Sequence, residues 1–478
     1  MNTKTIIGLE IHAQLSTKSK MFCSCKNEFG AVPNTHVCPT CLGHPGTFPM
    51  INKEAIKFAV MAGISFDCDI RTDMKMDRKK YFYPDLTKGY QISQEEEPLC
   101  TNGHILVKDE NGNDKKIRIR RIHMEEDTSK STHNEDGSTL LDYNRAGVPL
   151  IEIVTEPDMS TPEEARQFLD NLKQRLKFIG VSDVKMEEGS LRCDVNINVV
   201  DEDSGKKTGI SELKNLNSFK AVVRALEYEE KNHINMLKED IPSGKVTKKW
   251  DDINERTIKM RDKDIENDYR FTVEGDMPRI KLSKEFIDEL RNNLPELPHE
   301  KEKRYVEDMK IDLKDAQVLS QNKALSDLFE EVADRLDNPV VASNWILSNL
   351  LRRLNEYEEE ADEMNLSVDN FVSLIKLKED GKINNNVAKK ILRRIYESNE
   401  DPNEIVKKEG LIQIQDTNAL EKIVEEVLNE NPQTIEDYNN GKDRVIGYLV
   451  GQAMKKSKGQ GNPQEFNKMI VEKLKKNK

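Results

Sequence analysis

The sequence predicts an α+β protein, in which a body around a mixed, largely antiparallel sheet is followed by an all-helical domain and a small helical tail. Residues 1–293 contain many runs in which β-branched and polar residues alternate, a pattern typical of half-buried strands. From a Leu-Pro-Glu-Leu-Pro segment onward, residues 294–405 repeat apolar positions with helical spacing. A break at 401–410, which contains proline and glycine, separates this domain from the tail, 406–478.

The body combines strands with two helices, and this mixture favours an α+β fold. The strand-like runs cover residues 5–15, 115–127, 149–157 and 194–200. Thr161 followed by Pro162 is an N-cap and a first helical residue, and predicts a helix that runs towards Gly180. A second helix is predicted at residues 213–232.

Beyond the body, the helical pattern is clearest in residues 324–336 and 340–354. Four helices are predicted in the tail, at residues 417–429, 433–440, 442–457 and 463–476. The glycines and the proline between the last two end one helix and start the next.

Composition limits the class of protein. Hydrophobic residues make up 36% and charged residues 34% of the chain, which is enough apolar material for a large core. The net charge of −13 argues against non-specific binding of nucleic acid by the whole surface. No apolar run approaches the ~18–20 residues that span a bilayer, and no secretory signal opens the sequence. We therefore expect a cytosolic protein with no membrane partner.

Four of the seven cysteines fall within nineteen residues, at Cys23, Cys25, Cys38 and Cys41. In a reducing cytosol this clustering favours a metal site over disulfides. Two close cysteine pairs supply the four thiolates of a structural zinc site, which leaves no open position for chemistry. His36 and His44 are alternative ligands, and unligated buried thiols are the alternative interpretation. The remaining cysteines are expected to be small core residues, namely Cys68, Cys100 and Cys193.

A second set of ligands is of the oxygen and imidazole type. Glu10 and His12 alternate with apolar residues in a predicted strand, so they share a face. Residues 125–127 are three consecutive carboxylates at a strand end, and crowding them is costly without a cation. Asp194 and Asn196 share a face of a third strand. Such ligands suit Mg²⁺ or Mn²⁺, although an exposed polar face is the simpler interpretation of each run alone.

No Walker A motif occurs in the sequence, and the segment 205–211 lacks the required order of glycine and lysine. The segment 77–93 instead offers basic and aromatic side chains, which can neutralise or contact a triphosphate. Its residues of this kind are Arg78, Lys79, Lys80, Tyr81, Tyr83, Lys88 and Tyr90. An ordinary strand with aromatic residues in the core explains the segment equally well.

The last part of the chain is basic. Residues 441–478 carry ten Lys or Arg against three Asp or Glu. This segment could contact phosphates, or it could form the solvated face of a helix.

Taken in order, these motifs resemble those of the B subunits of the glutamine-dependent aspartyl/glutamyl-tRNA amidotransferases, the GatB type of the GatB/GatE family. The resemblance covers essentially the whole chain, and many long motifs in the same order are far more specific than one short pattern. The matching runs are IIGLEIHAQL, DRKKYFYPDLTKGYQISQ, RIHMEEDTSKSTH, DYNRAGVPLIEIVTEPD, VSDVKMEEGSLRCDVNI, ELKNLNSF, DYRFTVEGDMP, LPELP and LVGQAMKKSKGQGNP.

The resemblance implies a catalytic cradle domain, a helical domain and a tail similar to YqeY proteins. It implies a ligase that uses ATP to phosphorylate the side-chain carboxylate of Glu-tRNA(Gln), Asp-tRNA(Asn) or both. Ammonia then displaces phosphate to give the amide. The resemblance implies three partners. The first is the A subunit of the complex, an amidase that releases the ammonia from glutamine, and the others are the small C subunit and misacylated tRNA. DNA and membranes are not implied.

The resemblance also assigns site residues. It implies Mg²⁺ ligands at Glu10, His12, Glu125 and Asp194, with Glu126 as a further candidate. It implies contacts to the ATP phosphates from Lys79, Tyr81, Tyr83 and Arg192. With an RNA substrate implied, the basic tail fits contact to the tRNA backbone, through Lys455, Lys456 and Lys458. This chain departs from the family pattern at Thr128-Ser129, where an Ala-Gly pair is common, so the resemblance implies no phosphate contact by that part of the backbone.

Three alternatives remain at this point. The archaeal-type E subunit performs the same activation, but it carries an inserted domain for which the region between residue 278 and residue 294 leaves no room. A non-catalytic, zinc-containing RNA-binding subunit would explain the cysteines and the tail, and leaves the carboxylates without a purpose. A free-standing kinase of a small carboxylate would consume ATP without tRNA.

Overall fold

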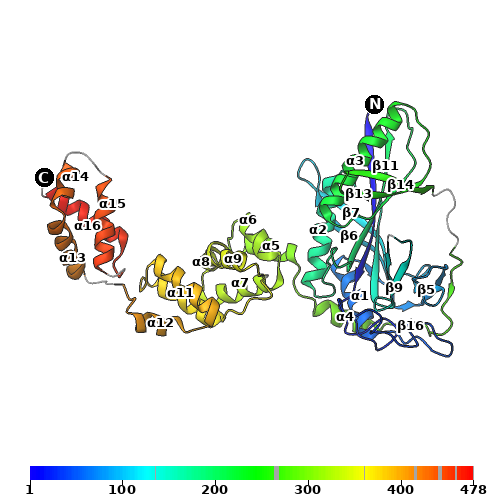
Figure 1. The fold of residues 1–478 in the computed structure, drawn as a ribbon, viewed down its shortest axis with the longest axis horizontal. Helices are drawn as coiled ribbons and strands as arrows, with labels where there is room; N and C mark the ends of the chain where they lie inside the picture. Colours follow the sequence, from blue (N-terminus) through cyan, green and yellow to red (C-terminus); the bar gives the residue numbers. More distant parts are fainter. Residues whose placement is uncertain are drawn as a thin grey trace. The chain divides into compact units, whose positions relative to one another are not determined.

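The computed structural model describes residues 1–134, 136–262, 269–359, 361–413, 417–439, 444–457 and 460–476. The chain divides into two compact units, Met1–Pro298 and His299–Lys478 (Figure 1). The first unit contains the sheets together with helices, and the second is helical in its described parts, so the predicted α+β class is confirmed. The finer division at residues 293 and 405 stays a prediction. Among the described residues, no helix is both long and apolar enough to cross a membrane.

A nine-stranded sheet forms the centre of the first unit, in the order β14-β13-β12-β11-β1-β10-β7-β6-β2. All of its described pairs are antiparallel except β12 with β13. The strands are β1 (Thr3–Gln14), β2 (Asp69–Ile70), β6 (Cys100–Lys108), β7 (Asp114–Glu126), β10 (Pro149–Thr155), β11 (Leu191–Asp201), β12 (Ser211–Lys214), β13 (Val246–Asp251) and β14 (Arg256–Asp262). The strand predictions at 5–15, 115–127, 149–157 and 194–200 all fall on strands of this sheet.

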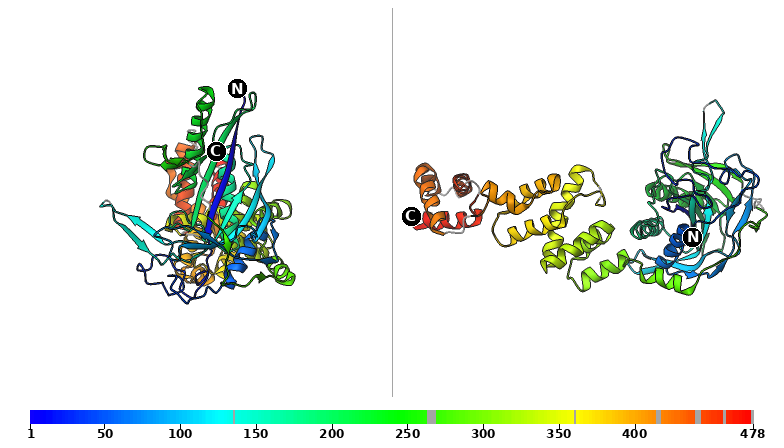
Figure 2. Two further views of the ribbon diagram at one scale, coloured as in Figure 1. Left: turned by 90° about the vertical axis from the view of Figure 1, so that its right-hand side faces the viewer. Right: turned by 90° about the horizontal axis from the view of Figure 1, so that it is seen from below.

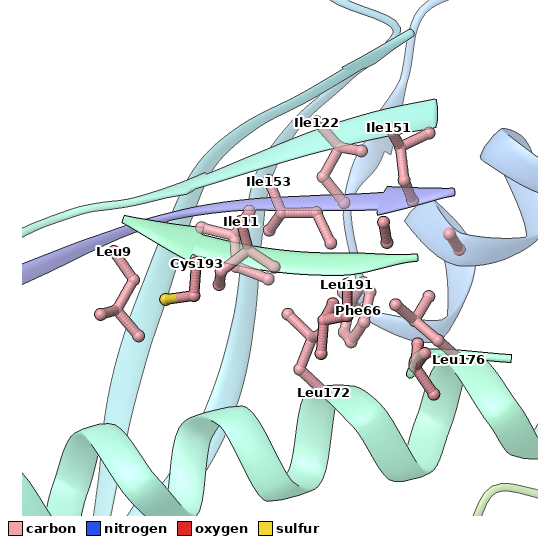
Figure 3. Packing of buried hydrophobic residues seen from close by; sticks show 14 of the residues in the cluster. Leu9, Ile11, Phe66, Ile122, Ile151, Ile153, Leu172, Leu176, Leu191 and Cys193 are labelled. Atoms are coloured by element: carbon pink, nitrogen blue, oxygen red, sulfur yellow. The ribbon is translucent and has the colours of Figure 1, made fainter. Parts of the chain in front are cut away.

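Two helices, α2 (Pro162–Phe178) and α3 (Phe219–Lys238), pack along one face of this sheet (Figure 1). The apolar side chains of β1 point to this face, and Leu9 and Ile11 are buried there. Figure 3 shows Leu172 reaching from α2 towards the same layer. Alternation along β1 therefore leaves its polar residues on the other face.

The helix predicted at Thr161-Pro162 is confirmed, because the Thr161 side chain accepts a hydrogen bond from the backbone N–H of Glu164. The second helix prediction, 213–232, was wrong at its start. Residues 211–214 form β12, where Leu213 pairs with Val195 of β11, and α3 begins at Phe219 after the N-cap Ser218. Pairing with a strand distant in sequence overrides the local helical pattern there.

Smaller elements complete the first unit. They are α1 (Lys53–Ser65), α4 (Lys284–Asn292), the three-stranded sheet of β15 (Thr272–Val273), β4 (Asp77–Lys80) and β5 (Tyr90–Ser93), the pair β3 (Asp73–Met74) and β16 (Ile280–Lys281), and the hairpin β8 (Lys130–His133) with β9 (Thr139–Asp142). Figure 2 shows this hairpin extending outward from the rest of the first unit.

The second unit has two separate apolar clusters. One includes Phe329 and Phe371, and the other includes Val424 and Phe466. The first is built from α5 (Pro298–Glu307), α6 (Leu313–Ser320), α7 (Lys323–Leu336), α8 (Pro339–Trp345), the π-helical turn Ile346–Leu350, α9 (Leu351–Tyr357), α10 (Val368–Glu379), α11 (Asn385–Ser398) and α12 (Pro402–Glu409). The second is built from α13 (Thr417–Glu430), α14 (Pro432–Asn439), α15 (Val445–Lys456) and α16 (Pro463–Lys476). These four match the predicted tail helices, whose residues 440–443 lie outside the described part.

A buried ionic group ties α3 to the edge of the sheet. Glu229 is fully buried and accepts hydrogen bonds from Lys248 at 2.6 Å and from Thr257, and His233 lies 3.4 Å away. Burial alone would raise the pKa of Glu229, but His233 and Lys248 outweigh it and lower that pKa to about 2.

We therefore expect Glu229 to make stability depend on pH. Its folded pKa lies below its unfolded value, so its contribution is complete above about pH 4.5 and is lost as the pH falls towards 2. The contribution is on the order of 3 kcal/mol, because one pKa unit corresponds to about 1.4 kcal/mol. Urea unfolding at pH 7 and pH 3 should show a smaller loss for Glu229→Gln than for the unmodified protein. An equal loss in both proteins would contradict this assignment.

Candidate active site

The polar face of β1 is extended by both of its neighbours. Glu10 lies opposite Asp194 of β11, and His12 lies opposite Arg192 of β11 and Glu152 of β10. Residues directly opposite in an antiparallel pair project to the same face. The register therefore gathers these side chains on one face, away from α2 and α3.

The next strand continues this arrangement. In the pairing of β10 with β7, Glu152 lies opposite His123, and Leu150 lies opposite Glu125. Both His123 and Glu125 are 2% exposed. The runs around residues 10, 125 and 194, which are far apart in sequence, therefore meet on four adjacent strands.

This face forms the floor of a cavity of about 880 Å³. Seven of the predicted site residues line it, namely Glu10, His12, Lys79, Tyr81, Glu125, Arg192 and Asp194. Tyr83 does not line it and is 68% exposed. Glu126 faces a smaller, separate cavity, where it pairs with Lys88 at 2.5 Å.

Two groups of metal-type donors lie in the cavity, and in each group the donor atoms are all within 4.8 Å of one another. The first consists of Glu10, His12 and Glu152, and the second consists of His123, Glu125 and Glu152. Asp194 belongs to neither group and instead pairs with Lys214. A set of carboxylates with imidazole fits Mg²⁺ or Mn²⁺.

Sequence reasoning missed Glu152, which is common to both groups, and it gave no role to His123, which lies just before the acidic run 125–127. Glu152 is a lone carboxylate in the apolar run 149–154 of a strand that is buried on both faces. A charge in such a strand is costly unless it is paired, and this was the available signal. Lys214 was likewise not assigned to the site, and Asp127 was included only as a member of the acidic run 125–127, without a role of its own.

The two histidines hold Glu152 in its charged form. The Glu152 Oε2 atom lies 3.3 Å from His12 Nε2 and 3.4 Å from His123 Nε2. Burial favours the neutral acid, but the histidines outweigh it and hold the pKa of Glu152 well below its usual range. Burial likewise disfavours the imidazolium of His123, yet Glu152 and Glu125 raise its pKa to about 9. The cavity floor is thus a compensated array of charges.

Side chains from β5 orient Glu125. Ser93 Oγ donates to one carboxylate oxygen at 2.6 Å, and Gln91 Nε2 donates to the other at 3.1 Å. His123 Nε2 lies 3.1 Å from the first oxygen. With four oxygen lone-pair sites available to a carboxylate, these contacts fix the group while leaving it able to bind a cation.

Basic and aromatic groups form the walls of the cavity. Lys79 Nζ lies 4.9 Å from the centre of the Tyr269 ring, which packs edge-on against Tyr81. Arg192 pairs with the buried carboxylate of Asp127 at 2.7 Å. This ion pair raises the pKa of Arg192, so the guanidinium stays charged. These groups can hold an anion over the acidic floor.

The cysteine cluster lies beside the smaller cavity. The sulfur atoms of Cys23, Cys25, Cys38 and Cys41 are all within 4.8 Å of one another. A tetrahedral zinc site with ~2.3 Å bonds separates its sulfurs by roughly 3.8 Å, so these residues fit zinc. His36 and His44 are not part of the group. The other three cysteines are buried, as predicted, at Cys68, Cys100 and Cys193.

The charge at this cluster is balanced by Lys20, which is fully buried with its Nζ 3.6 Å from Cys41 Sγ. The hydrogen bond from the Cys23 thiol is the main reason why the pKa of Cys41 falls to about 4. The Cys41 carbonyl also accepts a hydrogen bond from Thr87. The cluster thus anchors the loop that leads into β5.

We expect Cys41→Ser to abolish retention of zinc by the purified protein and to lower its melting temperature, because a structural zinc site contributes folding free energy. Metal analysis after gel filtration, together with thermal unfolding, tests this. Cys68→Ser is the matched control, since Cys68 is also buried but lies outside the cluster. Equal zinc content in the two variants would contradict a site at these cysteines.

The basic tail is partly neutralised. Lys456 pairs with Glu426 and Glu430 of α13, and Lys455 is exposed. Lys458 lies outside the described residues.

Two family models match the chain. One, described as the GatB/GatE catalytic domain, matches residues 5–288, and one described as the GatB domain matches residues 327–474. Similar curated proteins include the B subunit of the aspartyl/glutamyl-tRNA(Asn/Gln) amidotransferase of Finegoldia magna, 59% identical over 474 residues, which are 99% of this chain and the whole of the relative. The protein of the same name from Clostridium tetani is 47% identical over 476 residues, which span both chains completely.

Proposed function

We propose that this chain is the subunit that activates the side-chain carboxylate of the amino acid on a misacylated tRNA, because the chain belongs to the GatB/GatE family of tRNA amidotransferase subunits. It is of the B type, like the relatives from Finegoldia magna and Clostridium tetani. The reaction forms a carbon–nitrogen bond and converts ATP to ADP and phosphate. The substrates are Glu-tRNA(Gln), Asp-tRNA(Asn) or both, and the products are Gln-tRNA(Gln) or Asn-tRNA(Asn).

One observation carries this proposal: adjacent strands bring carboxylates and imidazoles together under basic side chains in a cavity of about 880 Å³. A carboxylate is a poor acyl donor, and forming an acyl phosphate turns one of its oxygens into a good leaving group. Glu152 together with Glu10 and His12, or together with His123 and Glu125, would hold a divalent cation, and such an ion would supply neutralisation of charge on the phosphoryl group. Asp194 has an indirect role in this site, because its ion pair with Lys214 fixes the position of the lysine side chain.

The chain's own residues position the reactants. Lys79 and Arg192 bind phosphoryl oxygens and hold the γ-phosphorus in line with an oxygen of the substrate carboxylate. That oxygen forms the new P–O bond while the bond to the β-phosphate oxygen breaks, and ADP leaves. Ammonia then attacks the acyl carbon, the bond from that carbon to the phosphate oxygen breaks, and the third proton of ammonia passes to the leaving phosphate to give HPO4²⁻. Tyr81, which is half-buried in the wall, limits access of water.

The partners follow from the place of this family in a multi-chain enzyme. We propose the amidase, or A subunit, as the source of ammonia and the small C subunit as the third member of a heterotrimer with this chain. The Cys cluster is proposed to hold zinc in a structural role.

The test is to incubate the co-purified complex with Glu-tRNA(Gln) or Asp-tRNA(Asn), glutamine and labelled ATP. We expect Gln-tRNA(Gln) or Asn-tRNA(Asn) together with released phosphate. Uncharged tRNA is the control and should not stimulate ATP consumption. ATP consumption without any tRNA would favour a kinase of a small carboxylate instead, and binding of tRNA without any turnover would favour a non-catalytic RNA-binding protein.

The basic tail is proposed to contact the tRNA backbone through Lys455, Lys456 and Lys458. We expect Lys455→Ala to weaken binding of all tRNAs alike and to reduce the dependence of log Kd on log salt by about 1, the value for one lost phosphate contact. Filter binding at several salt concentrations measures this. Lys473→Ala is the control, since Lys473 already pairs with Glu425. An unchanged slope for Lys455→Ala would remove this residue from the interface.

A further inference from the structure

The three consecutive carboxylates at the end of β7 have different surroundings. Glu125 lies on the cavity floor, and Glu126 pairs with Lys88 at the smaller cavity. Asp127 faces the same way as Glu125, because residues two apart share a face of a strand. It lines the large cavity while being only 4% exposed, and it belongs to neither group of metal-type donors. The position of Asp127 therefore needs an explanation of its own.

Both oxygens of the Asp127 carboxylate accept hydrogen bonds within the protein. Arg192 Nη2 donates to Oδ2 at 2.7 Å, and Gln14 Nε2 donates to the same atom at 2.8 Å. The backbone N–H of Thr128 donates to Oδ1 at 2.8 Å. The backbone of Asp127 is held too, by hydrogen bonds in both directions with residues 147–148. A carboxylate fixed in this way is suited to holding a cationic side chain in place.

Arg145 fixes the chain that follows the carboxylate. Its Nε donates to the carbonyl of Thr128 at 2.9 Å, and its Nη2 donates to the carbonyl of Ser129 at 2.8 Å. The same Nε lies 3.8 Å from Asp127 Oδ2. Of the two partners in the ion pair, Asp127 is therefore the one that is held by its surroundings, and Arg192 is the one that it holds.

The Arg192 side chain reaches this carboxylate from a distant strand. Arg192 lies on β11, which β1 and β10 separate from β7. Among the described residues, the bond from Nη2 to Asp127 is the only hydrogen bond of its guanidinium, and its Nε atom is buried without a partner. A guanidinium presents its N–H donors in one rigid plane, so an anchor at one nitrogen sets the direction of the others. The remaining donors are available to an anion in the cavity, which Arg192 lines.

We propose that Asp127 is a positioning residue for phosphoryl transfer, which holds Arg192 in the orientation that meets the transferring phosphoryl group. This inference rests on the proposed function and deepens it. An arginine side chain without such an anchor populates several rotamers, and ordering it would weaken its contact with the phosphoryl oxygens. A donor that is already oriented stabilises the transition state most effectively, because nothing has to reorganise during the reaction.

The test is a double-mutant cycle on the co-purified complex, read as the rate constant for consumption of γ-labelled ATP in a single turnover with misacylated tRNA. Asp127→Asn keeps the size of the side chain and removes its charge. We expect it to lower this rate constant by about 10–100-fold, the scale for misplacing a reacting group. In the Arg192→Gln background the same change should have less than about a twofold effect, because the group that Asp127 positions is gone.

Glu164→Gln is the matched control for loss of a buried carboxylate. Glu164 is 3% exposed and pairs with Lys115 at 2.7 Å, but it is not among the residues that line the cavity. Its replacement should leave the rate constant unchanged. If Asp127→Asn does not fold, as judged by circular dichroism, Gln14→Leu takes its place, since it removes the second donor to the same oxygen. It should lower the rate constant by about fivefold, the scale of one hydrogen bond, and only while Arg192 is present.

An unchanged rate constant, or an equal reduction with and without the Arg192 side chain, would overturn the proposal. A purely structural ion pair between β11 and the end of β7 would act in both backgrounds alike. The unmodified complex separates this inference from the proposed function. If that complex does not consume ATP in response to misacylated tRNA, the proposed function fails. If it does so and the cycle shows no coupling, only the role of Asp127 fails.

Discussion

Replacing Glu125 by glutamine is expected to lower ATP consumption driven by misacylated tRNA by at least about 100-fold, the scale for removing one preorganised group that stabilises charge in a transition state. Glu125 is 2% exposed, and Ser93, Gln91 and His123 hold its carboxylate in place. Glutamine keeps the shape of the side chain but removes the negative charge that would hold the proposed divalent cation. Labelled phosphate release with saturating Glu-tRNA(Gln) or Asp-tRNA(Asn) measures the effect.

Binding of tRNA provides the internal control for this variant. A residue that acts only on the phosphoryl group should leave the Kd for tRNA within about twofold, because ground-state binding is made elsewhere. Glu156→Gln carries the same change at a surface ion pair and should retain activity. Full turnover by Glu125→Gln would show that the carboxylate floor does not take part in the chemistry.

Truncating Leu172 to alanine is expected to lower the free energy of unfolding of the first unit by about 2–5 kcal/mol, the range for deleting a fully buried leucine side chain and leaving a cavity. Leu172 is 0% exposed on α2, and Figure 3 shows it directed towards Leu191 and Phe66 under the central strands. The same layer contains Ile11, whose neighbours in sequence are Glu10 and His12. Urea unfolding followed by the fluorescence of Trp250, which is buried in this unit, measures the change.

The neighbouring substitution Lys173→Ala is the control, because Lys173 is exposed on the same helix. It should change the free energy by less than about 0.5 kcal/mol. The folded fraction of Leu172→Ala should keep its turnover, since the polar face of the sheet is untouched. Equal stability of the two variants would contradict the packing of α2 against this layer.

Much of the molecule follows from local patterns in the sequence. Alternation in residues 5–15 was sufficient to place Glu10 and His12 on one face, and Thr161-Pro162 was sufficient to start α2. The spacing of Cys23, Cys25, Cys38 and Cys41 was sufficient to identify a cluster whose sulfurs do converge. These features depend on strand alternation, helix capping and short chain separations, which neighbouring residues determine.

Only the tertiary structure decided which charges meet. The register of β1 with β10, and of β10 with β7, brings Glu152 and His123 to the residues around position 10 and to Glu125. The pairing of β12 with β11 turned residues 211–214 into a strand and put Lys214 against Asp194, which withdraws that carboxylate from the two donor groups. Register is fixed by burying one face of every strand at once, and a shift of one residue would reverse each side chain. No single segment contains that information.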